Sequence, residues 1–173
     1  MLSCLYCESV AGGDLSQAVV YADDDAVAFL DWRQRAPGHV LVVPRRHLSA
    51  VELFTDEAGA RVLAMAMRVA TAVRVALGAD GVQMGAILYP GTGPARVSGR
   101  VHPTREVPME TAEDSHFHLH ILPRTHGGEL ARIYPYGDDV ATPEEMEEIA
   151  ARLREGLGGD GGQPGRACAP RPA

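Results

Sequence analysis

The stretch His116-Phe117-His118-Leu119-His120-Ile121-Leu122 carries the strongest structural signal in the chain, because histidine alternates strictly with apolar residues. Successive side chains of a β-strand point to opposite faces, so the pattern predicts a strand with three imidazoles on one face and apolar side chains in the core. The rings would lie about 7 Å apart. Three titratable rings are costly to bury without partners, which favours a functional site. The alternatives are a solvated strand face with chance histidines and a row of metal ligands.

Four upstream segments also have the composition of strands, being rich in β-branched and aliphatic residues and bounded by Gly, Pro or acidic turn residues. The short acidic stretch at residues 22–25 predicts a hairpin between the first two. The four segments are Val19–Tyr21, Ala26–Asp31, His39–Val43 and Val82–Leu88.

Two helices are expected. Asp56–Leu77 has apolar residues at helical spacing, with Thr55 as a candidate N-cap and Gly78 as the stop. The second begins at Thr142-Pro143-Glu144-Glu145, a capping box with proline in the first turn. An apolar stripe then runs from Met146 to Leu157 before two glycines. Together these elements predict an α+β domain over residues 1–157, and the Gly/Pro-rich residues 158–173 predict a disordered tail.

Composition narrows the class of protein. The 173 residues are 46% hydrophobic and 23% charged, as in an ordinary soluble globular domain with one core. The net charge of −7 argues against broad nucleic-acid binding, because a sequence-independent grip on phosphates needs a basic surface. No apolar run reaches the roughly 18 residues that cross a bilayer, and residues 1–7 lack the pattern of a secretion signal. We therefore expect a cytoplasmic protein that binds neither nucleic acid nor membranes.

Cys4 and Cys7 have the C-x-x-C spacing that supplies two thiolates of a tetrahedral zinc site. A pair of free thiols is the main alternative, and a redox pair is a weaker one because no βαβ pattern surrounds it. The third cysteine, Cys168, lies in the tail and is taken as incidental.

The sequence resembles the histidine triad (HIT) superfamily. Residues 116–122 match its signature His-φ-His-φ-His-φ-φ, where φ is apolar, at every position. Upstream, Val20–Asp31, which ends in Ala28-Phe29-Leu30-Asp31, resembles the family's Asp-containing strand. Gly38–His47 resembles its Gly-His-φ-φ-φ-φ-Pro-x-x-His segment. The opening Cys4-Leu5-Tyr6-Cys7 resembles the zinc-bearing start of many bacterial members. The resemblance covers most of residues 1–89 and 115–126, and implies a five-stranded antiparallel sheet with one long helix and a C-terminal helix.

The resemblance also implies the chemistry. The middle histidine, His118, would attack the α-phosphorus and form a nucleotidyl-histidine, which water or another acceptor resolves. His120 would hydrogen-bond the phosphoryl oxygens or the leaving group. His39 would orient the nucleophile or help neutralise the phosphate, although a structural histidine at a strand start is the alternative. Neutral imidazole is a competent nucleophile near pH 7, and a covalent intermediate divides one difficult displacement into two.

Ligand-binding residues follow from the same resemblance. Asp31 would accept hydrogen bonds from ribose hydroxyls, although a strand-end turn aspartate is the alternative. A base would stack on side chains for which core packing is at least as good an explanation, namely Phe29, Trp32, Leu5 and Tyr6. The family pattern completes a structural zinc site with four ligands: Cys4, Cys7, His47 and His116. Family members commonly pair as two-fold dimers, so a homodimer is expected.

The chain departs from the family before the triad. Tyr89-Pro90-Gly91 stands where many members have Asn-x-Gly, and Thr111–Ser115 lacks the usual Gln. Residues 90–114 form a long Gly/Pro-rich insertion or loop, either a functional wall or a disordered excursion. An arginine of that stretch would rebuild the phosphate-binding wall, the candidates being Arg96, Arg100 and Arg105. These changes leave open a non-catalytic nucleotide-binding or regulatory protein, and an enzyme for another nucleoside-like phosphorylated metabolite.

Overall fold

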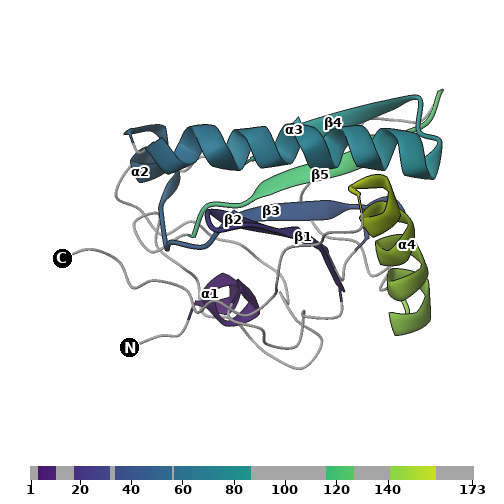
Figure 1. Cartoon of the computed structure of the whole chain (residues 1–173), viewed down its shortest axis with the longest axis horizontal. Coiled ribbons are helices and arrows are strands. Elements are labelled where there is room, and N and C mark those ends of the chain that lie inside the picture. The colour runs from purple at the N-terminus through teal and green to yellow at the C-terminus, as the bar shows by residue number, and fades with distance from the viewer. Residues whose placement is uncertain are drawn as a thin grey trace.

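The computed structural model describes residues 4–10, 18–31, 34–55, 57–86, 116–126 and 141–158. Its strands form one antiparallel sheet in the order β1-β2-β3-β5-β4, which confirms the predicted α+β fold with a five-stranded sheet (Figure 1). The strands are β1 (Val19–Ala22), β2 (Ala26–Leu30), β3 (Val40–Pro44), β4 (Gly81–Gly85) and β5 (Leu119–Arg124). The helices are α1 (Leu5–Val10), α2 (Ala50–Thr55), α3 (Glu57–Leu77) and α4 (Pro143–Gly156).

The predicted hairpin joins β1 to β2. Asp23 closes it with its side chain, because Oδ1 accepts hydrogen bonds from the backbone N–H groups of Asp25 and Ala26, each at 2.9 Å. Such a side-chain turn is the usual reason for aspartate at a tight connection. The backbone of Arg45, just after β3, donates to the carbonyl of Asp25 at 2.8 Å and ties the hairpin to its neighbour.

The two faces of the sheet are covered differently. Figure 1 shows α3 and α4 on one face and the short α1 on the other. On the helix face, alternate residues of β2 and β3 pack against α3 and α4, whose side chains Val62, Val69 and Leu153 are at most 1% exposed. On the α1 face, Val27, Phe29, Leu41 and Val43 form a smaller cluster with Val10. Phe117, Leu119 and Ile121 belong to the helix-face core, as the alternation predicted.

The capping box at Thr142 is present as predicted. The N–H of Glu145 donates to Thr142 Oγ1 at 3.2 Å, and the N–H of Thr142 donates to Glu145 Oε2 at 2.8 Å. Thr55 was predicted wrongly as the N-cap of the long helix. It is the last residue of α2, and its Oγ1 donates back to the carbonyl of Glu52 at 3.1 Å. A second capping box, between Ser49 and Glu52, starts that helix earlier in the chain.

The last strand begins later than the expected His116. β5 starts at Leu119, and its pairing with β3 ends where Leu119 meets Val42. Before that point the chain leaves the sheet, and the N–H of Phe117 donates to the carbonyl of Leu48 at 2.7 Å instead. Pro44, at the end of β3, has no N–H to extend the ladder. The first two triad histidines therefore precede the strand, and only His120 lies within it.

Three other expectations concern residues that are partly or wholly outside the described ranges. β4 ends at Gly85, and residues 87–88 of the strand predicted to reach Leu88 are not described. The same holds for residues 90–114 and for 159–173 of the tail. Over the ranges that are described, a search for a helix long and apolar enough to span a membrane finds none.

Candidate active site and metal centre

A side-chain hydrogen bond and two ring contacts help to position His118. Its Nδ1 lies 3.0 Å from the carbonyl oxygen of His116. Because a carbonyl oxygen can only accept, Nδ1 carries the proton, and the lone pair of the neutral ring is on Nε2. The ring stacks on Tyr6, with centroids 4.5 Å apart and an interplanar angle of 28°, and meets His120 edge-on at 5.1 Å. Nε2 is therefore the ring nitrogen whose lone pair can react.

Burial adjusts the protonation of this pair. Burial is the main cause that lowers the pKa of His118 to about 4, so its ring is neutral, the nucleophilic form, at pH 7. Burial also lowers the pKa of His120 to about 2, assisted by the neighbouring rings of His118 and His39. A nearby negative group would raise both pKa values, because it stabilises the protonated imidazole.

His120 is the end of a buried chain of three groups. Its Nδ1 lies 2.9 Å from Nε2 of His39, and Nδ1 of His39 lies 3.5 Å from Oδ2 of Asp31. Both histidines are fully buried and Asp31 is 5% exposed. A carboxylate accepts, so His39 donates to Asp31 and His120 donates to His39, which leaves the lone pair of His120 on Nε2. The structure thus places His39 against His120 rather than against the nucleophile.

Gln34 holds the loop that carries Asp31 and His39. Its Oε1 accepts from the N–H groups of Gly38 and His39 at 2.7 and 2.9 Å. Its Nε2 donates to the carbonyls of Asp31 and His39. One amide side chain therefore bonds to backbone on both sides of the β2–β3 connection, which fixes the separation of the two residues. Nothing in the sequence pattern singled out this glutamine, because its role depends on a loop geometry and not on periodicity.

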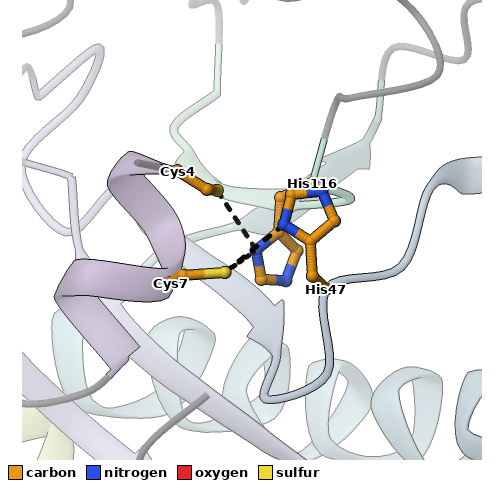
Figure 2. Close-up of side chains that lie close together, drawn as sticks. All are labelled: Cys4, Cys7, His47 and His116. Atoms are coloured by element: carbon orange, nitrogen blue, oxygen red, sulfur yellow. Dashed lines mark hydrogen bonds between the residues drawn. The ribbon is translucent and has the colours of Figure 1, made fainter. Parts of the chain in front are cut away.

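Four side chains predicted as zinc ligands converge between α1 and the sheet (Figure 2). Cys7 Sγ lies 3.3 Å from Nδ1 of His47 and 3.5 Å from Nδ1 of His116, and Cys4 Sγ lies 3.6 Å from the same His116 nitrogen. With Zn–S near 2.3 Å and Zn–N near 2.0–2.1 Å, a tetrahedral ion requires S···N separations of about 3.6 Å. The residues therefore fit a tetrahedral Cys2His2 zinc site.

The surroundings of the four ligands support the same assignment. Nε2 of His116 donates to the carbonyl of Pro44 at 2.8 Å, which leaves Nδ1 without a proton and directed at the thiols. The pKa of Cys4 is lowered to about 3, chiefly by its hydrogen bond with Cys7, against the opposing effect of burial. A thiolate is the form that binds metal.

The residues predicted to bind the base are placed unequally. Phe29 is 1% exposed and belongs to the apolar cluster on the α1 face, so its side chain is part of the core. Tyr6 packs against that cluster and stacks on His118. Trp32 and the side chain of Leu5 lie outside the described residues, as do the three arginines of residues 90–114.

Comparisons with known proteins agree with the fold. Residues 13–94 match the HIT domain family model. An uncharacterized HIT-like protein of Mycobacterium tuberculosis is 30% identical over 156 residues, covering 90% of this chain and 94% of that protein. An adenosine 5'-monophosphoramidase of Danio rerio is 34% identical over 56 residues, covering 32% of this chain and 35% of that protein. A Zn-bound histidine triad family protein from Mycobacterium smegmatis superposes with a TM-score of 0.59 at 28% identity, covering 90% of this chain and 93% of that chain.

Proposed function

Because the chain belongs to the histidine triad family, which includes nucleotide hydrolases and transferases, we propose that it is a nucleotide hydrolase or nucleotidyl transferase that works through His118. The observation that carries the proposal is the hydrogen bond from Nδ1 of His118 to the carbonyl of His116, at 3.0 Å. It fixes the tautomer whose Nε2 can attack phosphorus, while the ring is held from one side by Tyr6.

The first chemical step joins Nε2 of His118 to the α-phosphorus and breaks the bond from phosphorus to the leaving group. The leaving group takes a proton from Nε2 of His120, which a bound anionic phosphate has brought to its protonated form. His39 accepts the hydrogen bond from Nδ1 of His120 and in turn donates to Asp31. The carboxylate thereby stabilises positive charge on the imidazole pair.

The second step returns the enzyme to its starting state. Water, or another acceptor, attacks phosphorus and displaces Nε2 of His118, while Nε2 of His120 takes the proton that the attacking oxygen loses. Both histidines regain their first protonation states, so the cycle balances in atoms and charge. Two moderate displacements replace one difficult one.

Asp31 serves two partners in this proposal. Its Oδ2 faces His39, and its Oδ1 accepts from a ribose hydroxyl, since a carboxylate has two acceptor oxygens. For the base we propose contacts with Leu5 and Trp32, with Phe29 in the apolar cluster of the α1 face, while the ring of Tyr6 is stacked on His118. This assignment places the ribose beside the His39–His120 pair and the α-phosphate at His118.

We also propose one structural zinc per chain, bound by Cys4, Cys7, His47 and His116. When bound, the ion would cross-link α1 to the sheet and would supply no chemistry at phosphorus, because four protein ligands complete its tetrahedral shell. A homodimer in the cytoplasm completes the proposal. A monomeric mass by light scattering at tens of micromolar protein would refute the dimer.

Trapping the intermediate tests the central claim. The protein is mixed with a panel of α-labelled nucleotides, dinucleotides and phosphoramidates, quenched without acid, and assayed for acid-labile label on histidine. Wild type and His126→Ala, whose ring is exposed outside the site, should retain label, and His118→Ala should retain none. Label that persists in His118→Ala would refute the assigned nucleophile.

The altered residues before the triad favour a second candidate, a non-catalytic nucleotide-binding protein. The Gln that supplies an amide to the phosphate in many members is absent from Thr111–Ser115, and the acidic residues Glu113 and Asp114 in that stretch would repel an anionic substrate. Micromolar nucleotide binding by calorimetry, without label or turnover on any member of the panel, would support this candidate over the enzyme.

A further inference from the structure

Tyr6 lies at the junction of the metal cluster and the proposed nucleophile. In sequence it is between the two zinc-binding cysteines, on α1. In space its ring stacks on His118 at 4.5 Å and meets the ring of His116 edge-on at 6.0 Å. One aromatic ring thus contacts a proposed metal ligand and the residue that would carry out the chemistry.

The helix that carries Tyr6 depends on its attachments. α1 has six residues, far fewer than the roughly 12–15 needed for a helix to be even marginally stable alone in water. At one end the buried Val10 packs into the small apolar cluster, and at the other end Cys4 and Cys7 face His47 and His116. Removing the ion would remove the cross-link from Cys4 and Cys7 to His47 and His116, so α1 would be held less firmly against the sheet.

His118 needs an external support because it is not part of the sheet. β5 begins one residue later, so no strand pairing restrains this residue. Its ring is held by its hydrogen bond to the carbonyl of His116, by the edge contact with His120 and by the face of Tyr6. Of these supports, only Tyr6 comes from a segment distant in sequence and next to the metal.

From this arrangement we propose that Tyr6 is a positioning residue that transmits zinc occupancy to the active site, holding the His118 ring in its reactive orientation only while the metal fixes α1. The expected effect on kcat rests on the proposed function. The expected effect on the orientation of the His118 ring rests only on the ring contacts. Zinc would then control turnover without touching substrate. The proposal differs from a base-contact role for Tyr6, in which the ring would affect nucleotide affinity alone.

The structural arm of the test measures the imidazole signals of histidine-labelled protein by NMR, with the His118 signal assigned from its loss in His118→Gln. In zinc-loaded wild type the Tyr6 ring current should shift this signal. Tyr6→Leu should abolish the shift at unchanged zinc content, and Tyr6→Phe, which retains an aromatic ring, should restore it. Chelating zinc from wild type should abolish it as well. Tyr21→Leu, which changes a tyrosine on β1 that contacts Arg68, is the matched control and should leave the signal in place.

The kinetic arm uses whichever substrate the panel identifies. Tyr6→Leu should lower kcat about tenfold, the scale of a lost aromatic contact, with KM changed less than about threefold. Chelation should lower kcat in wild type but hardly further in Tyr6→Leu, because both act through one contact. A raised KM at unchanged kcat, or a His118 signal that neither change moves, would overturn the proposal. If no compound is turned over, the proposed function fails, and the NMR arm still decides whether zinc positions His118.

Discussion

The two faces of the sheet are made from the same strands but are stabilised in different ways. The helix face packs the apolar sides of α3 and α4 against alternate strand residues, and its buried members include Met65, Val69 and Leu153. The α1 face buries His39, His116 and His120, each completely, beside a much smaller apolar cluster. Hydrophobic burial is non-directional, whereas imidazoles need partners at defined atoms. The apolar core is therefore concentrated on one face, and the proposed chemistry on the other.

Burial of the imidazoles explains the hydrogen bonding of the α1 face. The buried imidazoles have named partners: the carbonyl of Pro44 for His116, and the His39–His120 pair with Asp31. Each contact offsets the cost of burying a polar ring and also selects a tautomer. The hydrogen bonds that offset the cost of burying these rings thus also set the tautomers that the proposed proton transfer needs.

The largest expected effect is on kcat/KM, from a substitution on the α1 face. His118→Ala should lower kcat/KM at least about 10⁴-fold, because the covalent route is lost, while the free energy of unfolding changes by less than about 1.5 kcal/mol, the scale of one aromatic contact. Steady-state kinetics and urea denaturation of the same preparation measure both. Near wild-type turnover would show that the α1 face does not carry chemistry through this residue.

Metal binding gives the next effect. The double change Cys4→Ala and Cys7→Ala should remove zinc and lower the free energy of unfolding by roughly 4 kcal/mol, less than in isolated zinc modules because the helix face folds with its own core. Elemental analysis and denaturation check this result, and Cys168→Ala should leave zinc content unchanged. Protein purified without chelator that holds no stoichiometric metal would contradict the zinc assignment.

A core substitution on the opposite face should give the reverse pattern to His118→Ala. Leu153→Ala removes a fully buried side chain of α4 and should cost about 3 kcal/mol of unfolding free energy with kcat unchanged. Leu63→Ala, at a position that is 54% exposed on α3, is the control and should have little effect. A large loss of kcat in Leu153→Ala at temperatures where the protein is folded would show that the faces are coupled.

The smallest effect tests a single cap. Thr142→Ala removes the oxygen that accepts from the N–H of Glu145 and should cost about 1 kcal/mol, measured as a shift in the urea midpoint. Turnover should not change, since α4 packs on the helix face. An equal loss from Thr142→Ser would argue that the methyl group, and not the capping bond, stabilises the helix.

Local rules predicted the parts of the fold that depend on local sequence. Strict alternation correctly assigned Phe117, Leu119 and Ile121 to the core, and the Thr142 box gave the start of α4. The short helices α1 and α2 were missed, since six residues are too few for a periodic signal, and Thr55 was misassigned as a result. Helices of that length owe their existence to tertiary contacts.

The site was less predictable, because the three histidines are equally spaced in sequence but have different neighbours in the structure. His116, His118 and His120 repeat every two residues, but the chain leaves the sheet before Leu119, so one faces the cysteines, one faces Tyr6 and one faces His39. The alternation pattern carries no information about where strand pairing ends. The convergence of Cys4 with His116 came only from family resemblance, and the stacking of Tyr6 on His118 was not foreseen at all.

The order of the strands has a consequence for folding. β5 is the last strand in sequence among the residues that the structure describes, yet it lies between β3 and β4. The contacts it completes are remote: His39 and His120 are 81 residues apart, and Cys4 and His116 are 112 apart. Contacts of high sequence separation form late and slowly, whereas the β1–β2–β3 meander and α3 can form from nearby residues. During synthesis on a ribosome, the meander can therefore assemble first. The contacts of the candidate site, such as that between His39 and His120, form only when β5 inserts between β3 and β4.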